Sequence, residues 1–181
     1  LSGTALKYIA ILAMTIDHIA WLFVPLYSPA GQVMHLVGRS TIPIMCFFIS
    51  EGYHHTKNVR RYLLRMLIFA AVSHFPFMLF EGKSLSFTGT ESVIADLMLS
   101  LLAVTVLRSE RIDRAFKVPL AVLIVYFAAY CDWRVYGGYF TLAFEFARDS
   151  GRKRQLQAYS LVVLAYLLPT LETIFRAPSD I

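Results

Sequence analysis

The first long apolar stretch of the chain carries one basic side chain, one acidic side chain and one imidazole. It runs from Ala5 to Val24 and contains Lys7, Asp17 and His18. Lys7 and His18 are eleven residues apart, about three α-helical turns, so they share one helix face and lie roughly 16 Å apart along its axis. An Asp, Lys or Arg at the centre of a membrane helix costs about 2.5–3.5 kcal/mol on insertion scales. The stretch therefore predicts a transmembrane helix whose polar groups are retained for a function.

The overall composition is typical of an integral membrane protein. Hydrophobic residues make up 57% of the 181 residues, charged residues only 16%, and the mean hydropathy is +0.60. These values exclude an ordinary soluble domain, so we expect an all-α, polytopic transmembrane helical bundle that forms one domain over residues 1–181. The net charge of +5 would favour nucleic acid as a partner of a soluble protein. Here the basic residues cluster in short loops between apolar runs, so the expected partner is the lipid bilayer and not nucleic acid.

Seven apolar segments are candidate membrane crossings. The last four are shorter than the roughly 20 residues that a perpendicular crossing requires. The fifth and sixth are therefore open to a second interpretation, as segments that are re-entrant or partly buried in protein. The seven are Ala5–Val24, Val33–Tyr53, Leu63–Phe80, Val93–Leu107, Val118–Tyr130, Val135–Ala147 and Leu156–Leu171.

The distribution of basic residues between the loops predicts the orientation. Lysines and arginines are concentrated in the loops 54–61, 108–117 and 148–155, whereas the loop 25–32 has none and the loop 81–92 has only Lys83. Loops rich in Lys and Arg face the cytoplasm. The N-terminus is therefore predicted to be cytoplasmic, and the C-terminus is on the other side after seven crossings.

This topology places polar side chains of five segments at a similar depth, in the outer half of the membrane. A buried guanidinium needs a carboxylate, so we expect Arg39 to be buried and paired with Asp17, Asp96 or Asp132. Adjacent helical residues point about 100° apart, so Asp17 has two possible roles, to orient His18 or to bind Arg39. Simpler interpretations stay open for four residues. They are an interfacial position in the membrane for His35 and Asp132, a packing role for His74 and a purely structural ion pair for Arg39.

A second polar group is predicted at the cytoplasmic side. Lys57, Arg61 and Arg65 are spaced i, i+4, i+8 and would form one stripe able to bind phosphates if the third helix begins early. Ordinary positive-inside anchoring is the alternative interpretation. No metal is expected. Ligand spacing occurs in only one segment, at Glu51, His54 and His55, and the two cysteines, Cys46 and Cys131, lie in separate apolar segments as free thiols.

Several of these motifs resemble the TraX family, which is named for an enzyme that N-acetylates conjugative pilin. The resemblance covers most of the chain and is most specific in its first 80 residues. The motifs that carry it are Leu6-Lys7-Tyr8-Ile9, Thr15-Ile16-Asp17-His18-Ile19, Gly38-Arg39-Ser40-Thr41-Ile42-Pro43-Ile44, Ser50-Glu51-Gly52-Tyr53-His54-His55-Thr56 and Arg61-Tyr62-Leu63-Leu64-Arg65, with weaker echoes at Pro76-Phe77 and Asp132…Tyr136-Gly137.

The spacing of Lys7 and His18 is also similar to the signature of transmembrane acyltransferases of the acyltransferase-3 type. These resemblances imply an enzyme of the bacterial cytoplasmic (inner) membrane that moves an acetyl group from acetyl-CoA, its co-substrate, to an amine or hydroxyl of a pilin-like N-terminus or an envelope glycan. The expected catalytic residues are His18 as general base, Asp17 to orient it and Arg39 to stabilise the oxyanion. The expected substrate-binding residues are Lys7, Glu51, Tyr53, Arg61, Arg65, Asp96 and Asp132.

The chain departs from the family pattern in three places. An acidic residue is expected near His74, a threonine near Asp96, and a further C-terminal segment with a Pro–His pair after the present end at Ile181. The sequence thus predicts either a truncated chain or a shorter relative. A different class of function, a proton-coupled transporter or ion-binding membrane protein, would use the same buried Asp, His and Arg side chains.

Overall fold

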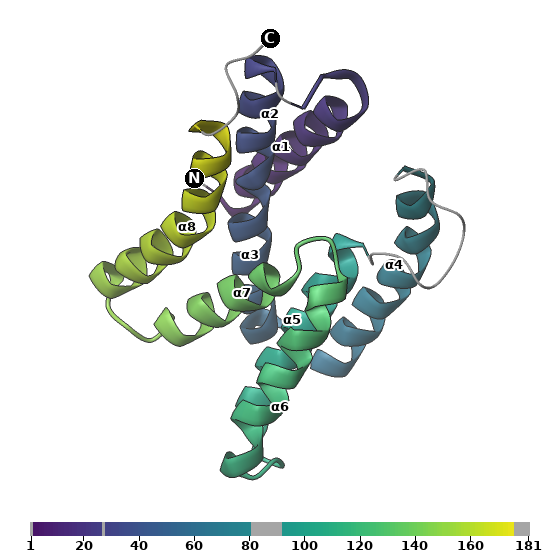
Figure 1. Cartoon of the computed structure of the whole chain (residues 1–181). Coiled ribbons are helices and arrows are strands. Elements are labelled where there is room, and N and C mark those ends of the chain that lie inside the picture. The colour runs from purple at the N-terminus through teal and green to yellow at the C-terminus, as the bar shows by residue number, and fades with distance from the viewer. Residues whose placement is uncertain (1, 27, 81–91, 176–181) are drawn as a thin grey trace.

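The computed structural model of this protein describes residues 2–26, 28–80 and 92–175, and within these residues it is helical with no extended strand (Figure 1). The fold class predicted from composition and apolar periodicity is confirmed. The helices are α1 (Gly3–Phe23), α2 (Pro29–Arg39), α3 (Thr41–His55), α4 (Val59–Phe80), α5 (Val93–Arg108), α6 (Arg114–Phe127) with a short 3₁₀ turn η1 (Ala128–Tyr130), α7 (Val135–Ala147) and α8 (Arg152–Phe175).

The predicted second segment, Val33–Tyr53, consists of two helices. α2 ends at Arg39, and α3 begins two residues later. In a continuous helix the Arg39 carbonyl would accept a hydrogen bond from residue 43, but Pro43 has no N–H to donate. The Ser40 N–H instead bonds back to the Val37 carbonyl at 3.1 Å. The break places Arg39 at a helix end.

Among the residues that the structure describes, three helical stretches are long and apolar enough to cross a membrane. They are Gly3–Phe23, Pro29–His55 and Val59–Phe80, and they correspond to the first three predicted crossings. The predicted segments that follow coincide with helices α5 to α8, and their crossing of the bilayer stays a prediction. The predicted loop 81–92 lies outside the described residues except for its last residue, and so does the chain end at Ile181.

Helices α3, α5 and α7 contact one another and form the centre of the bundle, with α1 against α3, α4 against α5 and α8 against α7. Figure 1 shows α3 near the middle, α8 on one side and α4 on the other. The apolar core between the central helices consists of Ile42, Cys46 and Ile49 of α3, Leu97 and Leu101 of α5, and Phe140 and Phe144 of α7. A second cluster joins α5 to α6.

The outer faces of α1 and α4 are apolar as well. Their large hydrophobic side chains are exposed, among them Leu12 and Phe23 of α1 and Phe69 and Leu79 of α4. A helix that is apolar on its outer as well as its inner face is typical of a membrane span. The protein is therefore a membrane protein, and polar side chains lie between its helices.

Candidate functional site

The C-terminal ends of α1 and α4 and the segment before α7 line a pocket of about 310 Å³, which we call the outer pocket after the side of the membrane on which the topology predicts it. Its wall combines aromatic rings with two carboxylates and one imidazole. The lining residues are Asp17, His18, Trp21 and Leu22 of α1, Phe77 and Phe80 of α4, and Asp132. The structure thus brings together three of the predicted site residues, which come from two distant parts of the chain.

His18 is oriented by the backbone of its own helix. Its Nδ1 lies 2.8 Å from the Met14 carbonyl oxygen. Because a carbonyl only accepts, Nδ1 is the donor and carries the hydrogen. A neutral His18 therefore has its lone pair on Nε2, which is the tautomer that a general base needs. The ring also packs against Phe80, with the two centroids 4.8 Å apart.

Asp17 is bound by a histidine of α2. The His35 Nδ1 lies 2.8 Å from the Asp17 Oδ1, and His35 is buried. This side chain therefore packs inside the protein, and its depth in the membrane stays a prediction. A Cβ added at Gly38 would lie 2.3 Å from the Asp17 Cβ, so the absence of a side chain at Gly38 is what lets α2 approach α1 this closely.

Arg39, at the end of α2, is only half-buried, so the expectation that it is buried is wrong. The reason is its position at the end of α2, where the chain breaks. The charges of Arg39, Asp17 and Asp132 all act on the hydroxyl of Tyr166 in α8, which places the four residues in one neighbourhood. An ion pair between Arg39 and one of the carboxylates stays a prediction.

Asp96 of α5 is fully buried behind this neighbourhood. Ser100 donates a long hydrogen bond of 3.5 Å to its Oδ1, and its Oδ2 has no hydrogen-bond partner among the described residues. A Cβ added at Gly137 of α7 would lie 2.4 Å from the Asp96 Oδ1. The charge of Asp132 acts on Asp96. Asp96 thus adjoins the outer pocket without lining it.

At the other end of the bundle, one buried carboxylate joins the three central helices. Glu145 of α7 is 2% exposed. It accepts hydrogen bonds from the Ser50 Oγ at 2.8 Å, the His54 Nε2 at 2.9 Å and the Arg108 Nε at 2.6 Å. We call these four residues the inner network. The sequence reasoning missed Glu145, although a lone charge in the segment Val135–Ala147 was a signal that could have found it.

Glu51 is part of an adjoining ion-pair group. It binds the Arg148 guanidinium, and the His55 Nε2 lies 3.3 Å from its Oε2. His54 bonds to Glu145 instead, so the three residues with ligand spacing do not converge. No group of three or more possible metal ligands occurs in the part of the chain that the structure describes. Tyr53, which precedes His54 in α3, lies close enough to Glu145 and Arg108 for their charges to act on its hydroxyl.

The basic residues expected to bind the donor differ in their placement. α4 begins at Val59, so Lys57 precedes the helix and the predicted three-residue stripe is wrong. Arg61 and Arg65 do lie on α4, four residues apart and exposed, and Arg65 stacks over Tyr62, at 5.8 Å from the ring centroid. The Lys7 Nζ is 5.0 Å from the ring centroid of Phe48 in α3.

The chain is similar to known proteins over most of its length. The profile of the family described as "TraX protein" matches residues 2–177. The chain is also similar to the "Probable fimbrial assembly protein FimC, serogroup H1" of Dichelobacter nodosus, with 36% identity in an alignment that covers 96% of this chain and 73% of the relative. No solved structure matches the chain.

Proposed function

The chain belongs to the TraX family, and from this membership and the outer pocket we propose that it is a membrane acetyltransferase. It moves an acetyl group from acetyl-CoA to an amine or hydroxyl of an acceptor at or beyond the membrane. The observation that supports the proposal is the state of His18, which lines the pocket and whose Nδ1 is committed to the Met14 carbonyl. A neutral imidazole fixed in this tautomer can take a proton at Nε2.

The reaction follows from this geometry. The Nε2 of His18 accepts the proton of the acceptor N–H or O–H while the acceptor atom attacks the thioester carbonyl. The new C–N or C–O bond forms, the C–S bond breaks, and the imidazolium returns the proton to the departing CoA sulfur. His18 ends neutral, so no further reactant is needed.

Two charged residues would stabilise this sequence of steps. Asp17 lies beside His18 in the pocket wall, and its negative charge favours the transient imidazolium. Arg39 does not line the pocket; it would add a positive charge from the end of α2, and such a charge stabilises the oxyanion that develops on the thioester carbonyl. Asp132 would contribute to acceptor binding from the pocket wall, and Asp96 would contribute only indirectly, because it is buried behind the pocket.

The donor would approach from the cytoplasmic side. Lys7 together with Arg61 and Arg65 would bind the phosphates of acetyl-CoA, because guanidinium and ammonium groups match phosphate oxygens. Glu51 and Tyr53 lie at the end of α3 on the same side. The relative from Dichelobacter nodosus bears the name of a fimbrial assembly protein, which favours a pilin-like N-terminus over an envelope glycan as the acceptor.

The test is the release of CoA from acetyl-CoA by the purified protein in lipid nanodiscs, with a peptide amine or a sugar hydroxyl as acceptor. His18→Asn is the critical variant, because its amide can still donate to the Met14 carbonyl but cannot act as a base. We expect His18→Asn to lose at least about 10²-fold in kcat, and His55→Ala, whose side chain is 76% exposed, to stay near the wild type.

Turnover of His18→Asn within a few-fold of the wild type would show that His18 has only a structural role. A wild type that releases no CoA but carries protons across liposomes would instead favour the proton-coupled transporter.

A further inference from the structure

Asp17 is held from behind the outer pocket by a residue of another helix. Asp17 lines the pocket, whereas His35 of α2 does not. The His35 Nδ1 and the Asp17 Oδ1 are 2.8 Å apart. An ionised carboxylate can only accept, so at this distance the imidazole nitrogen donates its hydrogen to Asp17.

This hydrogen bond is the one that orients His35. The residue is 9% exposed, and its Nε2 is buried with no hydrogen-bond partner among the residues that the structure describes. The indole of Trp21 packs on the imidazole with 4.9 Å between the ring centroids, and Trp21 lines the pocket. An acceptor in the pocket therefore meets Trp21 and Asp17, while His35 acts through Asp17.

The backbone of α2 contacts Asp17 as well. Gly38 lies three residues after His35 on the same helix, and a Cβ at this position would come within 2.5 Å of the Asp17 Oδ1. α2 thus touches the carboxylate in two ways, by a hydrogen bond from His35 and by close packing of Gly38. Two such contacts leave the carboxylate little freedom to rotate.

We propose that His35 is a positioning residue, which rests on the proposed acetyl transfer. By donating its Nδ1–H, it fixes the Asp17 carboxylate next to His18. There the negative charge stabilises the imidazolium that His18 becomes when it accepts the proton. The arrangement divides the two orienting tasks, because the Met14 carbonyl sets the tautomer of His18 and His35 sets the position of the charge beside it.

Two substitutions of similar size separate this role from others. The amide nitrogen of His35→Asn occupies the place of Nδ1 and can still donate to Asp17, whereas His35→Leu cannot. Because Nε2 has no partner, its loss in His35→Asn breaks no hydrogen bond. His35→Gln places its amide nitrogen near the position of Nε2 and serves as the matched control.

The experiment measures CoA release by the full chain in nanodiscs as a function of acetyl-CoA concentration. A misplaced catalytic group costs on the order of 10²-fold, so we expect His35→Leu and His35→Gln to lose about 10²-fold in kcat with little change in the KM for acetyl-CoA. His35→Asn should recover most of that loss. If the leucine variant does not purify as a monodisperse protein, the comparison of Gln with Asn takes its place.

Other outcomes overturn the inference in distinguishable ways. If His35→Asn is as inactive as His35→Leu while the wild type turns over, Nε2 is needed and His35 is itself a proton acceptor. If all three variants keep wild-type kcat, the hydrogen bond is only structural. A wild type that releases no CoA overturns the proposed function, and this inference with it.

Discussion

Glu145 is the residue on which the charge balance of the inner network depends. It is buried, and it accepts from Ser50, His54 and Arg108. Removing one partner of a buried ion pair costs about 3–5 kcal/mol because the other charge is left without compensation. The Arg108 side chain is 40% exposed, so water can compensate part of that loss, and the low end of the range applies.

We therefore expect Glu145→Ala to destabilise the protein by about 3 kcal/mol, which for a chain of this size is a fall in Tm of roughly 6–12 °C. Thermal unfolding followed by size-exclusion chromatography in detergent measures it. The matched control is Asp149→Asn, because Asp149 is 81% exposed and lies 3.7 Å from Arg108. A Tm of Glu145→Ala equal to that of the control would show that the inner network contributes nothing to stability.

At the scale of single residues, the sequence predicts which side chains matter better than it predicts their partners. Depth in an apolar run identified Asp17 and His18, and the structure places both in one pocket. The sequence could not identify His35 as a partner of Asp17, because the two residues belong to different helices and are 18 positions apart. Such a contact depends on how closely α1 and α2 pack, and the periodicity of apolar residues along one helix does not predict that distance.

At the scale of elements, the contact between α1 and α2 depends on Gly38. A methyl group there would lie 2.3 Å from the Asp17 Cβ, so Gly38→Ala must push the helices apart or displace Asp17. Forcing extra atoms into a packed contact costs typically about 1–3 kcal/mol. We expect a lower Tm and a loss of CoA release in this variant. Gly151→Ala is the control, because a Cβ at Gly151 meets nothing within 4 Å; equal behaviour of the two alanine variants would contradict the close approach.

The helices themselves were largely predictable, since apolar runs and basic loops mark their ends. The break between α2 and α3 was not predicted, although Pro43 was a usable signal for it. The start of α4 was also misjudged. Asn58 accepts a hydrogen bond from the Arg61 N–H at 3.0 Å through its side chain, a capping interaction that begins a helix and leaves Lys57 outside.

The exposed arginines of α4 provide a prediction about the donor. If Arg61 and Arg65 bind the phosphates of acetyl-CoA, replacing both with Gln should raise the KM for acetyl-CoA about 10²-fold or more, because each charge-assisted hydrogen bond contributes roughly 1.5–3 kcal/mol and every 1.4 kcal/mol is a factor of about ten. Added salt should weaken donor binding by the wild type and have less effect on the variant. Steady-state kinetics at two ionic strengths measure both effects.

The control for this experiment removes the same charge from another loop. Arg111→Gln with Arg114→Gln takes one positive charge from the turn between α5 and α6 and one from the first residue of α6, and it leaves α4 intact. A KM that stays unchanged in the α4 variant, together with an equal effect of both double variants on membrane insertion, would identify the α4 arginines as topological anchors.

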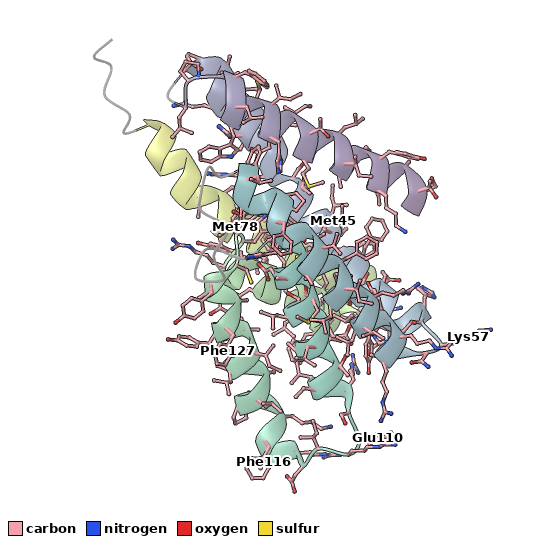
Figure 2. The ribbon with its side chains drawn as sticks, turned by 90° about the vertical axis from the view of Figure 1, so that its right-hand side faces the viewer. Met45, Lys57, Met78, Glu110, Phe116 and Phe127 are labelled. Atoms are coloured by element: carbon pink, nitrogen blue, oxygen red, sulfur yellow. The ribbon has the colours of Figure 1, made fainter. Side chains whose placement is uncertain are left out.

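At the scale of the whole molecule, ion pairs bring the C-terminal ends of three helices to one end of the bundle. Glu51 of α3 pairs with Arg148 after α7, and Arg108 of α5 pairs with Glu145 of α7. The basic loops that follow these helices therefore lie at the same end. Figure 2 shows Glu110, in the turn between α5 and α6, and Phe116 of α6 at the lower end of the molecule, with Met78 of α4 far above them. This arrangement agrees with the alternation of charge, in which every second loop faces the cytoplasm.

The orientation can be tested by labelling single introduced cysteines. Ala30 lies near the start of α2 and Glu110 in the turn between α5 and α6, and both are exposed. The native thiols, Cys46 and Cys131, are buried, so they should react little with a membrane-impermeant maleimide. In intact cells we expect Ala30→Cys to be labelled from outside and Glu110→Cys to be labelled only after the inner membrane is opened. Loops rich in Lys and Arg stay in the cytoplasm, so the reverse pattern would invert the topology and place the outer pocket on the cytoplasmic side, where an acceptor beyond the membrane could not reach His18.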